Sequence, residues 1–332
     1  MFYGKTPSPL LADTREINVV LKLFTPKPCS VLGLDISSTA ISLLEITHDK
    51  ARYCVTGYGR WLLPEQVIEH GVIKKMDIVA HGIKMLVANA DLSTRQAVLA
   101  VPDSSTITKI IQVHRSLSER DIEELVNVEA IKYMPNSTQN IHCDFNIVGS
   151  SSTQLNMLDV RLVATRAENV EQRVEIVRRA GLDVGFVGVE SCAIERVGER
   201  LVPFGHQQTI AMFDMGFVYT HFCVLQGAKM IFSHGDVFGG KPFINTLTQR
   251  HGMEPRDVIG AIEQGGLLDG DVAGFFQSTR EMLCLQLKRA LHLFLSNNPH
   301  STVEELVLAG GVAKLPGLVP AIQEQFNIST RV

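Results

Sequence analysis

The sequence predicts an α/β protein of two related lobes, with a ligand site where strands of both lobes end. One pattern of short strands occurs twice along the chain, and each copy leads through helical sequence to a further strand that is apolar on both faces. The chain has 332 residues, and single hydrophobic cores stop growing at roughly 250–300 residues. The length therefore allows more than one core.

The repeated pattern is a meander of three β-branched and apolar strands, in which an Asp closes the first strand. Asp35 and Asp214 take the same place in the two copies. Ligands of α/β folds bind in the crevice at strand ends, so we expect these two aspartates on opposite walls of one cleft. The predicted strands of the two copies, each with its later apolar strand, are 31–35, 40–46, 51–57 and 97–101, and 209–214, 219–225, 228–234 and 306–309.

Two insertions are predicted between the repeated elements. Ser118 and Asp121 have the spacing of a helix start, two extended runs follow, and a second helix ends at Gly181. The later insertion is mostly helical, and its long helix is expected to bury Met282, Leu285, Leu291 and Leu295. The predicted divisions are a loose leader over 1–28, a first lobe over 29–103 and 182–206, an inserted subdomain over 104–181, a second lobe over 207–241 and 299–332, and a helical insertion over 242–298.

The composition is that of an ordinary globular chain and argues against several functions. The formal net charge of −4 and the lack of a sustained basic run give no electrostatic reason to expect nucleic-acid binding. The six cysteines and eleven histidines show no metal-ligand spacing, and the cysteines are expected to be reduced. The sequence shows neither a signal peptide nor an apolar stretch of the roughly 18 residues that span a bilayer.

Four segments have the makeup of a nucleotide site. The turn after Asp35 offers backbone N–H groups and three hydroxyls to phosphate oxygens. The turn after Asp214 offers a second carboxylate and a glycine that lets the backbone approach a ligand. The other two segments are glycine pairs that precede helices, and the later pair suits a base and ribose. The candidate binding residues are Asp35, Ser37, Ser38, Thr39, Asp214, Gly216, Gly239, Gly240, Gly310, Gly311 and Lys314.

Three segments resemble motifs of the actin-like ATPase superfamily. The segment with Gly33 and Asp35 resembles its first phosphate motif, Phe213–Gly216 its second phosphate motif, and Leu308–Gly317 its adenosine motif. Over residues 27–332 the chain resembles more closely the PilM family of type IV pilus assembly, which is related to the division protein FtsA. The stretches that carry this closer resemblance are Asp121–Pro135, Ala180–Val184, Val189–Ala193 and Phe238–Gly240.

The resemblance implies an actin-like (ribonuclease H-like) fold of two lobes, in which 104–181 is the 1C subdomain beside the first lobe, 1A. The second lobe is then 2A and its helical insertion 2B. The resemblance also implies ATP in the cleft, with Mg²⁺ held through water by Asp35 and Asp214. A groove between 1A and 1C would hold the N-terminal cytoplasmic peptide of PilN. The chain would then be cytoplasmic, peripheral to the inner membrane, in a complex with PilO and PilP, and capable of self-association.

The chain departs from the family pattern beside both phosphate turns. Ser37 replaces the turn glycine, and Ser42 stands where the family has a lysine. The loss of that cation predicts nucleotide binding weaker by about 1.5–3 kcal/mol. Phe217 and Tyr219 add bulk after the second turn, where we expect them to crowd the phosphates. Nucleotide binding with weak or absent ATPase activity is therefore expected, and no catalytic residue is assigned.

Three functions follow from these observations. The leading interpretation is a binding and scaffolding protein of the PilM type. The first alternative is an active ATPase, or a sugar or acetate kinase of the same superfamily, although the sequence shows no additional catalytic Asp or substrate motif. The second alternative is a filament-forming protein like FtsA.

Overall fold

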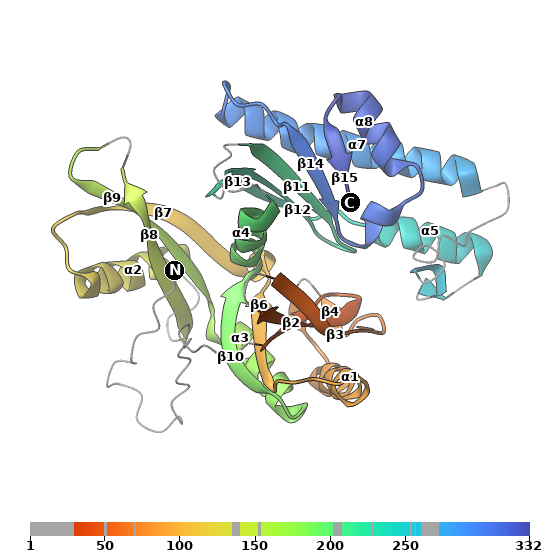
Figure 1. Ribbon diagram of the computed structural model, residues 1–332, viewed down its shortest axis with the longest axis horizontal. Coiled ribbons are helices and arrows are strands. Elements are labelled where there is room, and N and C mark those ends of the chain that lie inside the picture. The colour runs from red at the N-terminus through yellow and green to blue at the C-terminus, as the bar shows by residue number, and fades with distance from the viewer. Residues whose placement is uncertain are drawn as a thin grey trace. The chain divides into compact units, whose positions relative to one another are not determined.

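The computed structural model has two units, Met1–Glu190 and Ser191–Val332, whose elements are labelled in Figure 1. Each unit has its own hydrophobic core. The predicted leader over 1–28 and part of the second insertion lie outside the described residues. No helix among the described residues is both long and apolar enough to cross a membrane. The described residues are 30–49, 52–69, 71–134, 140–151, 154–201, 208–227, 229–252, 254–255, 257–259 and 272–332.

The first unit is built on a sheet with the strand order β10-β6-β1-β2-β3. β1, β2 and β3 form the predicted antiparallel meander, and β6 and β10 add to it in parallel. One face of the sheet packs on α1 and α3 around Leu32, Leu34 and Ile41. These elements are β1 (Ser30–Ile36), β2 (Ala40–Asp49), β3 (Arg52–Leu62), β6 (Gln96–Val101), β10 (Asp183–Val189), α1 (Met76–Asn89) and α3 (Ala167–Arg179), with the short hairpin β4 (Ile68–Glu69) and β5 (Val72–Ile73) before α1.

Glu45 fastens the meander to the loop between α1 and β6. Its side chain has no exposed surface. Thr56 Oγ1 donates to its carboxylate at 2.7 Å, and the backbone N–H groups of Ser93 and Thr94 both donate at 2.9 Å. Burial by itself raises the pKa of Glu45, but these hydrogen bonds together lower it. The folded state therefore favours the charged carboxylate.

The inserted part of the first unit has a three-stranded sheet of order β7-β9-β8, with α2 packed on one face (Figure 1). α2 begins with the predicted capping box between Ser118 and Asp121. β7 was not predicted, and it follows β6 after a single turn of 3₁₀ helix. The elements are η1 (Asp103–Ser105), β7 (Thr106–His114), α2 (Glu119–Tyr133), β8 (Ile141–Ser150) and β9 (Met157–Arg166).

The helix that was expected to complete the insertion, α3, packs elsewhere. Ile176 and Val177 of α3 lie in the core around Leu32 of the first sheet, whereas the core of the insertion is formed by α2 and the three-stranded sheet. The last helix of the segment 104–181 therefore covers the first sheet. The exact limits of the inserted subdomain stay a prediction.

The second unit repeats the sheet topology of the first. Its strand order, β13-β12-β11-β14-β15, is an antiparallel meander to which two parallel strands add. Asp35 of β1 pairs with Ser42, and Asp214 of β11 pairs with His221, so each Asp faces the residue seven positions later. These matching registers confirm the predicted repeat. The strands are β11 (Thr209–Met215), β12 (Thr220–Gln226), β13 (Lys229–Asp236), β14 (Glu305–Ala309) and β15 (Ser329–Arg331).

Helices cover both faces of the second sheet. α5, α7 and α8 pack on the face that carries Phe213, and Ile194 of α4 packs on the opposite face against Ile210 and Met212. The helical elements are α4 (Glu190–Leu201), α5 (Lys241–His251), α7 (Val272–Asn297), η2 (Gly311–Lys314) and α8 (Leu318–Phe326). The extent of the predicted helical insertion, 242–298, stays a prediction because it includes residues outside those described.

The predicted buried face of α7 was wrong. Leu291 is buried, but Met282, Leu285 and Leu295 are exposed. The buried residues repeat at three- to four-residue steps, which is the period of one helix face. Apolar residues occur around most of this helix, so their presence alone did not identify the face. The buried positions are Phe276, Thr279, Leu283, Cys284, Leu287, Ala290, Leu291 and Phe294.

Candidate nucleotide-binding site

The turn between β1 and β2 is braced by the serine that replaces the family's glycine. Ser37 N donates to Ala40 O at 2.9 Å, Ser37 Oγ donates to the same oxygen at 2.9 Å, and Ala40 N donates to Ser37 Oγ at 3.3 Å. A glycine would lack the two bonds that involve the hydroxyl. Ser37 therefore shapes the turn, and the partly exposed Ser38 and Thr39 are better placed than Ser37 to offer hydroxyls to a ligand.

Asp35 stands next to this turn in a charged environment. Its side chain reaches solvent, yet protein surrounds it on most sides. This burial raises the pKa of Asp35, while Arg60 and Arg173 act to lower it. A carboxylate that is partly desolvated gains stability from a cation, so Asp35 suits the neighbourhood of a metal ion.

Arg173 is a buried cation that the sequence analysis missed. It is 1% exposed; its Nη1 donates to Asn169 O at 2.9 Å and its Nη2 to Gly71 O at 3.0 Å. Its Nε has no hydrogen-bond partner among the described residues. Desolvation lowers the pKa of Arg173, and the charges of Glu190 and Asp35 act to raise it. The positive charge of Arg173 therefore acts on Asp35 from the interior of the first unit.

In the second unit, backbone hydrogen bonds bring the Asp214 turn and a glycine pair together. Gly216 N donates to Tyr219 O at 3.0 Å, and Gly240 N donates to Gly216 O at 3.0 Å. A Cβ on Gly239 would lie 2.4 Å from the carbonyl oxygen of Phe217, so only glycine fits there. Two segments that the sequence predicted separately are therefore in direct contact.

The second glycine pair contacts the same turn. Gly310 has a φ of +83°, and a Cβ on it would lie 2.3 Å from Met215 O and 2.6 Å from Asp214 Oδ1. A Cβ on Gly311, in contrast, would meet no atom within 4 Å. Gly310 therefore packs against the turn, whereas Gly311 faces open space in which a ligand can approach the backbone. Lys314 is exposed at the end of η2, and its role stays a prediction.

The two bulky residues after the Asp214 turn lie against other parts of the unit. Phe217 is partly buried and packs against the hydrophobic core, and the expected crowding of phosphates by its side chain stays a prediction. The hydroxyl of Tyr219 occupies the place of a Cβ on Gly235, at 2.0 Å from it. Tyr219 therefore covers Gly235 on β13, two strands away from Asp214.

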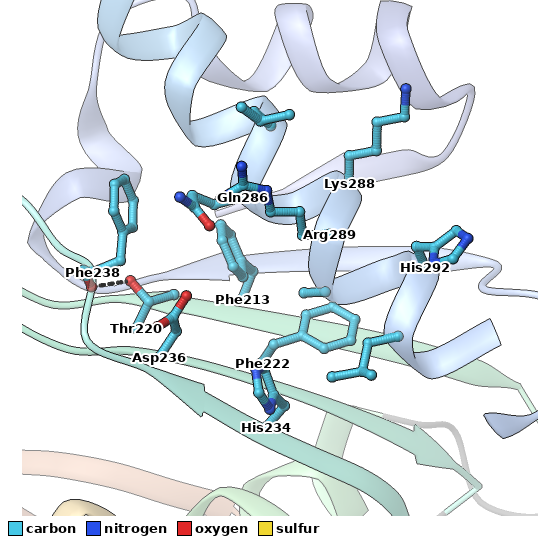
Figure 2. Close-up of a pocket in the computed structure, with 13 residues that line it drawn as sticks. Phe213, Thr220, Phe222, His234, Asp236, Phe238, Gln286, Lys288, Arg289 and His292 are labelled. Atoms are coloured by element: carbon cyan, nitrogen blue, oxygen red, sulfur yellow. Dashed lines mark hydrogen bonds between the residues drawn. The ribbon is translucent and has the colours of Figure 1, made fainter. Parts of the chain in front are cut away.

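A cavity of about 560 Å³ lies beside these segments, between α7 and the strands β12 and β13 (Figure 2). Phe213, Phe222 and Phe238 line it from the sheet side, and Arg289 and other polar residues line it from α7. Thr220 Oγ1 donates to the carbonyl of Phe238 at 2.7 Å, next to Gly239. The lining suits a flat apolar group with a negative charge at the rim.

The residues fit Mg²⁺ only together with a phosphate ligand. Among the described residues, no group of three or more His, Cys, Asp or Glu side chains is placed to hold a metal. Mg²⁺ usually keeps several waters and takes one or two carboxylates plus substrate phosphates. Asp35 in the first unit and Asp214, beside Gly310 in the second, are each a carboxylate of this kind.

A family model described as "Type IV pilus assembly protein PilM" matches residues 33–332 of the chain. The chain belongs to the PilM family. Among solved structures, a chain of a "PilM-PilN type IV pilus biogenesis complex" is similar at 22% identity and a TM-score of 0.77, over 92% of this chain and 88% of that chain. The ethanolamine utilization protein EutJ from Carboxydothermus hydrogenoformans is similar at 14% identity and a TM-score of 0.55, over 93% and 86%. These matches confirm the predicted actin-like fold.

Proposed function

We propose that this PilM-family chain is an actin-like adaptor of type IV pilus assembly that binds Mg-ATP and the N-terminal peptide of PilN. The observation that carries nucleotide binding is the contact of both glycine pairs with the Asp214 turn, beside a Gly311 that faces open space. Three separately predicted motif segments meet there within one unit. Such an arrangement is typical of a site where backbone approaches a ligand closely.

In this proposal the turns of both units bind the same nucleotide. Ser38 and Thr39 offer hydroxyl and N–H groups to phosphate oxygens, and Asp35 and Asp214 hold Mg²⁺ through water. The metal ion neutralises phosphate charge when bound. Gly310, Gly311 and the nearby Lys314 form the adenosine side of the site.

Release and identification of nucleotide from the purified protein tests this proposal. The expected result is adenine nucleotide in near-stoichiometric amount, or its uptake from added Mg-ATP. Protein that retains no nucleotide and takes up none contradicts nucleotide binding but leaves the peptide partner to be tested by itself.

The proposed partner is the cytoplasmic N-terminal peptide of PilN, since PilN is named with PilM in a similar structure. We place the peptide in the groove between 1A and 1C, on the face of the three-stranded sheet that α2 does not cover. Ile110 of β7 is 54% exposed on this face, in a row with Arg161 and Asn146. An exposed apolar side chain between polar neighbours suits an anchor of a short peptide.

Titration of a labelled PilN peptide tests this placement. We expect Ile110→Asp to weaken binding at least tenfold, because it puts a charge in an apolar contact. Val128→Asp is the matched control: Val128 is 59% exposed on the outer side of α2, where the peptide is not expected. Tight binding to Ile110→Asp, or its loss in Val128→Asp alone, contradicts the placement.

The same adaptor role places the chain on the cytoplasmic side of the inner membrane, peripheral to it, in an assembly with PilO and PilP and with self-association. Copurification of the chain with membranes only when PilN is present is the expected result. Membrane association without PilN contradicts attachment through this partner.

An active ATPase or small-molecule kinase is the second candidate. The cavity between α7 and β13 favours it, because Asp236 and Arg289 line a space that a small substrate could fill. Phosphate release at many turnovers per minute, abolished by Asp35→Ala, supports this candidate. Stable binding of ATP without release supports the adaptor.

A further inference from the structure

An arginine lies in line with Asp35 on the outer face of the first sheet. Asp35 of β1 is opposite Ser42 of β2, and Ser42 is opposite Arg60 of β3. Directly opposite residues of antiparallel strands place their side chains on the same face. Neighbouring strands are about 4.8 Å apart, so the backbones at Asp35 and Arg60 are about 10 Å apart. We call these three residues the Asp35 row.

The charge of Arg60 is felt at Asp35, where it acts to lower the pKa of the carboxyl against the effect of burial. Ser42, between them, is small and uncharged. It leaves the long side chain of Arg60 room to lie across the row toward the turn. Arg60 thus places an exposed, positively charged side chain on the face of the sheet that carries Asp35.

We propose that Arg60 binds the nucleotide phosphates at the Asp35 turn. It takes the role of the family's lysine, which is replaced by Ser42 in this chain. This inference rests on the proposed nucleotide binding. A polyphosphate carries several negative charges, and Asp35 adds another. Binding beside Asp35 therefore needs a positive group on the same face, besides any metal ion.

Arg173, the other arginine near Asp35, is poorly suited to this role. It is buried, and both of its Nη atoms donate to backbone carbonyl oxygens. Arg60 is exposed at the surface of the same region. Its planar guanidinium offers paired donors that match phosphate oxygens better than the single ammonium of a lysine does.

The test compares a nucleotide that has phosphates with one that lacks them. Calorimetric titrations of Mg-ATP and of adenosine are run on the wild type and on Arg60→Gln. The loss of a charged hydrogen bond predicts Mg-ATP binding weaker by about 10- to 100-fold, with adenosine binding unchanged. Arg52→Gln is the matched control, because Arg52 is exposed on the same strand but lies opposite Asp49, at the far end of the hairpin.

A second variant tests the row itself. Ser42→Lys in the Arg60→Gln background restores a cation between the two positions and is expected to recover most of the lost Mg-ATP affinity. If the wild type binds Mg-ATP and Arg60→Gln binds it equally well, the role of Arg60 is overturned while nucleotide binding stands. If the wild type binds no Mg-ATP, both proposals are overturned. An equal loss of adenosine and Mg-ATP in Arg60→Gln also overturns a phosphate-specific role.

Discussion

Replacement of Gly310 by Ala tests whether the glycine pair is held against the Asp214 turn. The φ of +83° at Gly310 costs a residue with a side chain about 1–2 kcal/mol. The new Cβ would also lie 2.3 Å from Met215 O, and relieving such an overlap in a packed region costs about 1–3 kcal/mol. We therefore expect the free energy of unfolding to fall by about 2–5 kcal/mol.

Gly311→Ala is the matched control, one residue away with the same change in chemistry. Its Cβ would meet nothing within 4 Å, so the free energy of unfolding should change by about 0.5 kcal/mol or less. The added methyl group enters the space proposed for adenosine, and Mg-ATP binding should weaken although stability does not. Urea unfolding followed by circular dichroism measures the first effect, and calorimetric titration measures the second. Equal stability losses in the two variants, or a loss below about 1 kcal/mol in Gly310→Ala, would show that Gly310 is not held against the Asp214 turn.

Three further predictions follow from single titratable groups. The hydrogen bonds to Glu45 lower its pKa. Its contribution to stability is therefore present above the pKa of about 4.5 that it has in the unfolded chain, and is lost as pH falls through the pKa of the folded state. Glu45→Gln should reduce the free energy of unfolding by about 1–3 kcal/mol at pH 7 and by less in acid. Urea titrations at pH 7 and in acid measure this difference, and an equal loss at the two pH values contradicts it. The pKa of Asp35 is raised, so its contribution to stability falls as pH rises through the folded pKa. Asp35→Asn should therefore raise the melting temperature at pH 7 while weakening Mg-ATP binding, and a lower melting temperature contradicts this. Burial, more than the nearby Asp144 and Glu123, raises the pKa of Cys143 to about 11, so at pH 8 iodoacetamide should modify the exposed Cys54 well before Cys143, as peptide mass analysis would show.

The sequence was sufficient for the repeated strands because their physical signal is local. Each meander consists of apolar runs between turn residues, and each Asp lies at a strand end, so the equivalence of Asp35 and Asp214 needed no knowledge of the rest of the fold. The helix start at Ser118 was predicted for the same reason, since a capping box involves only four consecutive residues.

The features that were missed depend on which elements become neighbours. Strand β7 follows β6 after a short turn, but it pairs with β9, which comes much later in the chain, so its place in the sheet has no local signal. The buried face of α7 depends on which side the second sheet covers, because apolar residues occur on several sides of that helix. The contact of Phe217 with the core of its unit likewise depends on elements that are distant in the sequence.

The sequence predicted the backbone segments of the site but not the two arginines near Asp35, Arg60 and Arg173. Glycine pairs and strand-end aspartates are visible as motifs, and contacts such as that of Gly310 with Asp214 then confirm that the segments meet. Arg60 gave no signal, because its place beside Asp35 depends on the pairing of three strands. Arg173 left a weak signal in the sequence. It and Asn169 are two polar residues, four positions apart, on the helix face that also buries Val177.

Titration of Mg-ATP into the wild type and into Asp214→Asn tests whether the Asp214 turn takes part in nucleotide binding. The substitution keeps the shape of the side chain beside Gly310 and removes its charge, so the fold should be preserved. We expect saturable binding near one nucleotide per chain in the wild type and binding at least tenfold weaker in the variant. Equal binding by both proteins, or no binding by the wild type, would contradict this expectation.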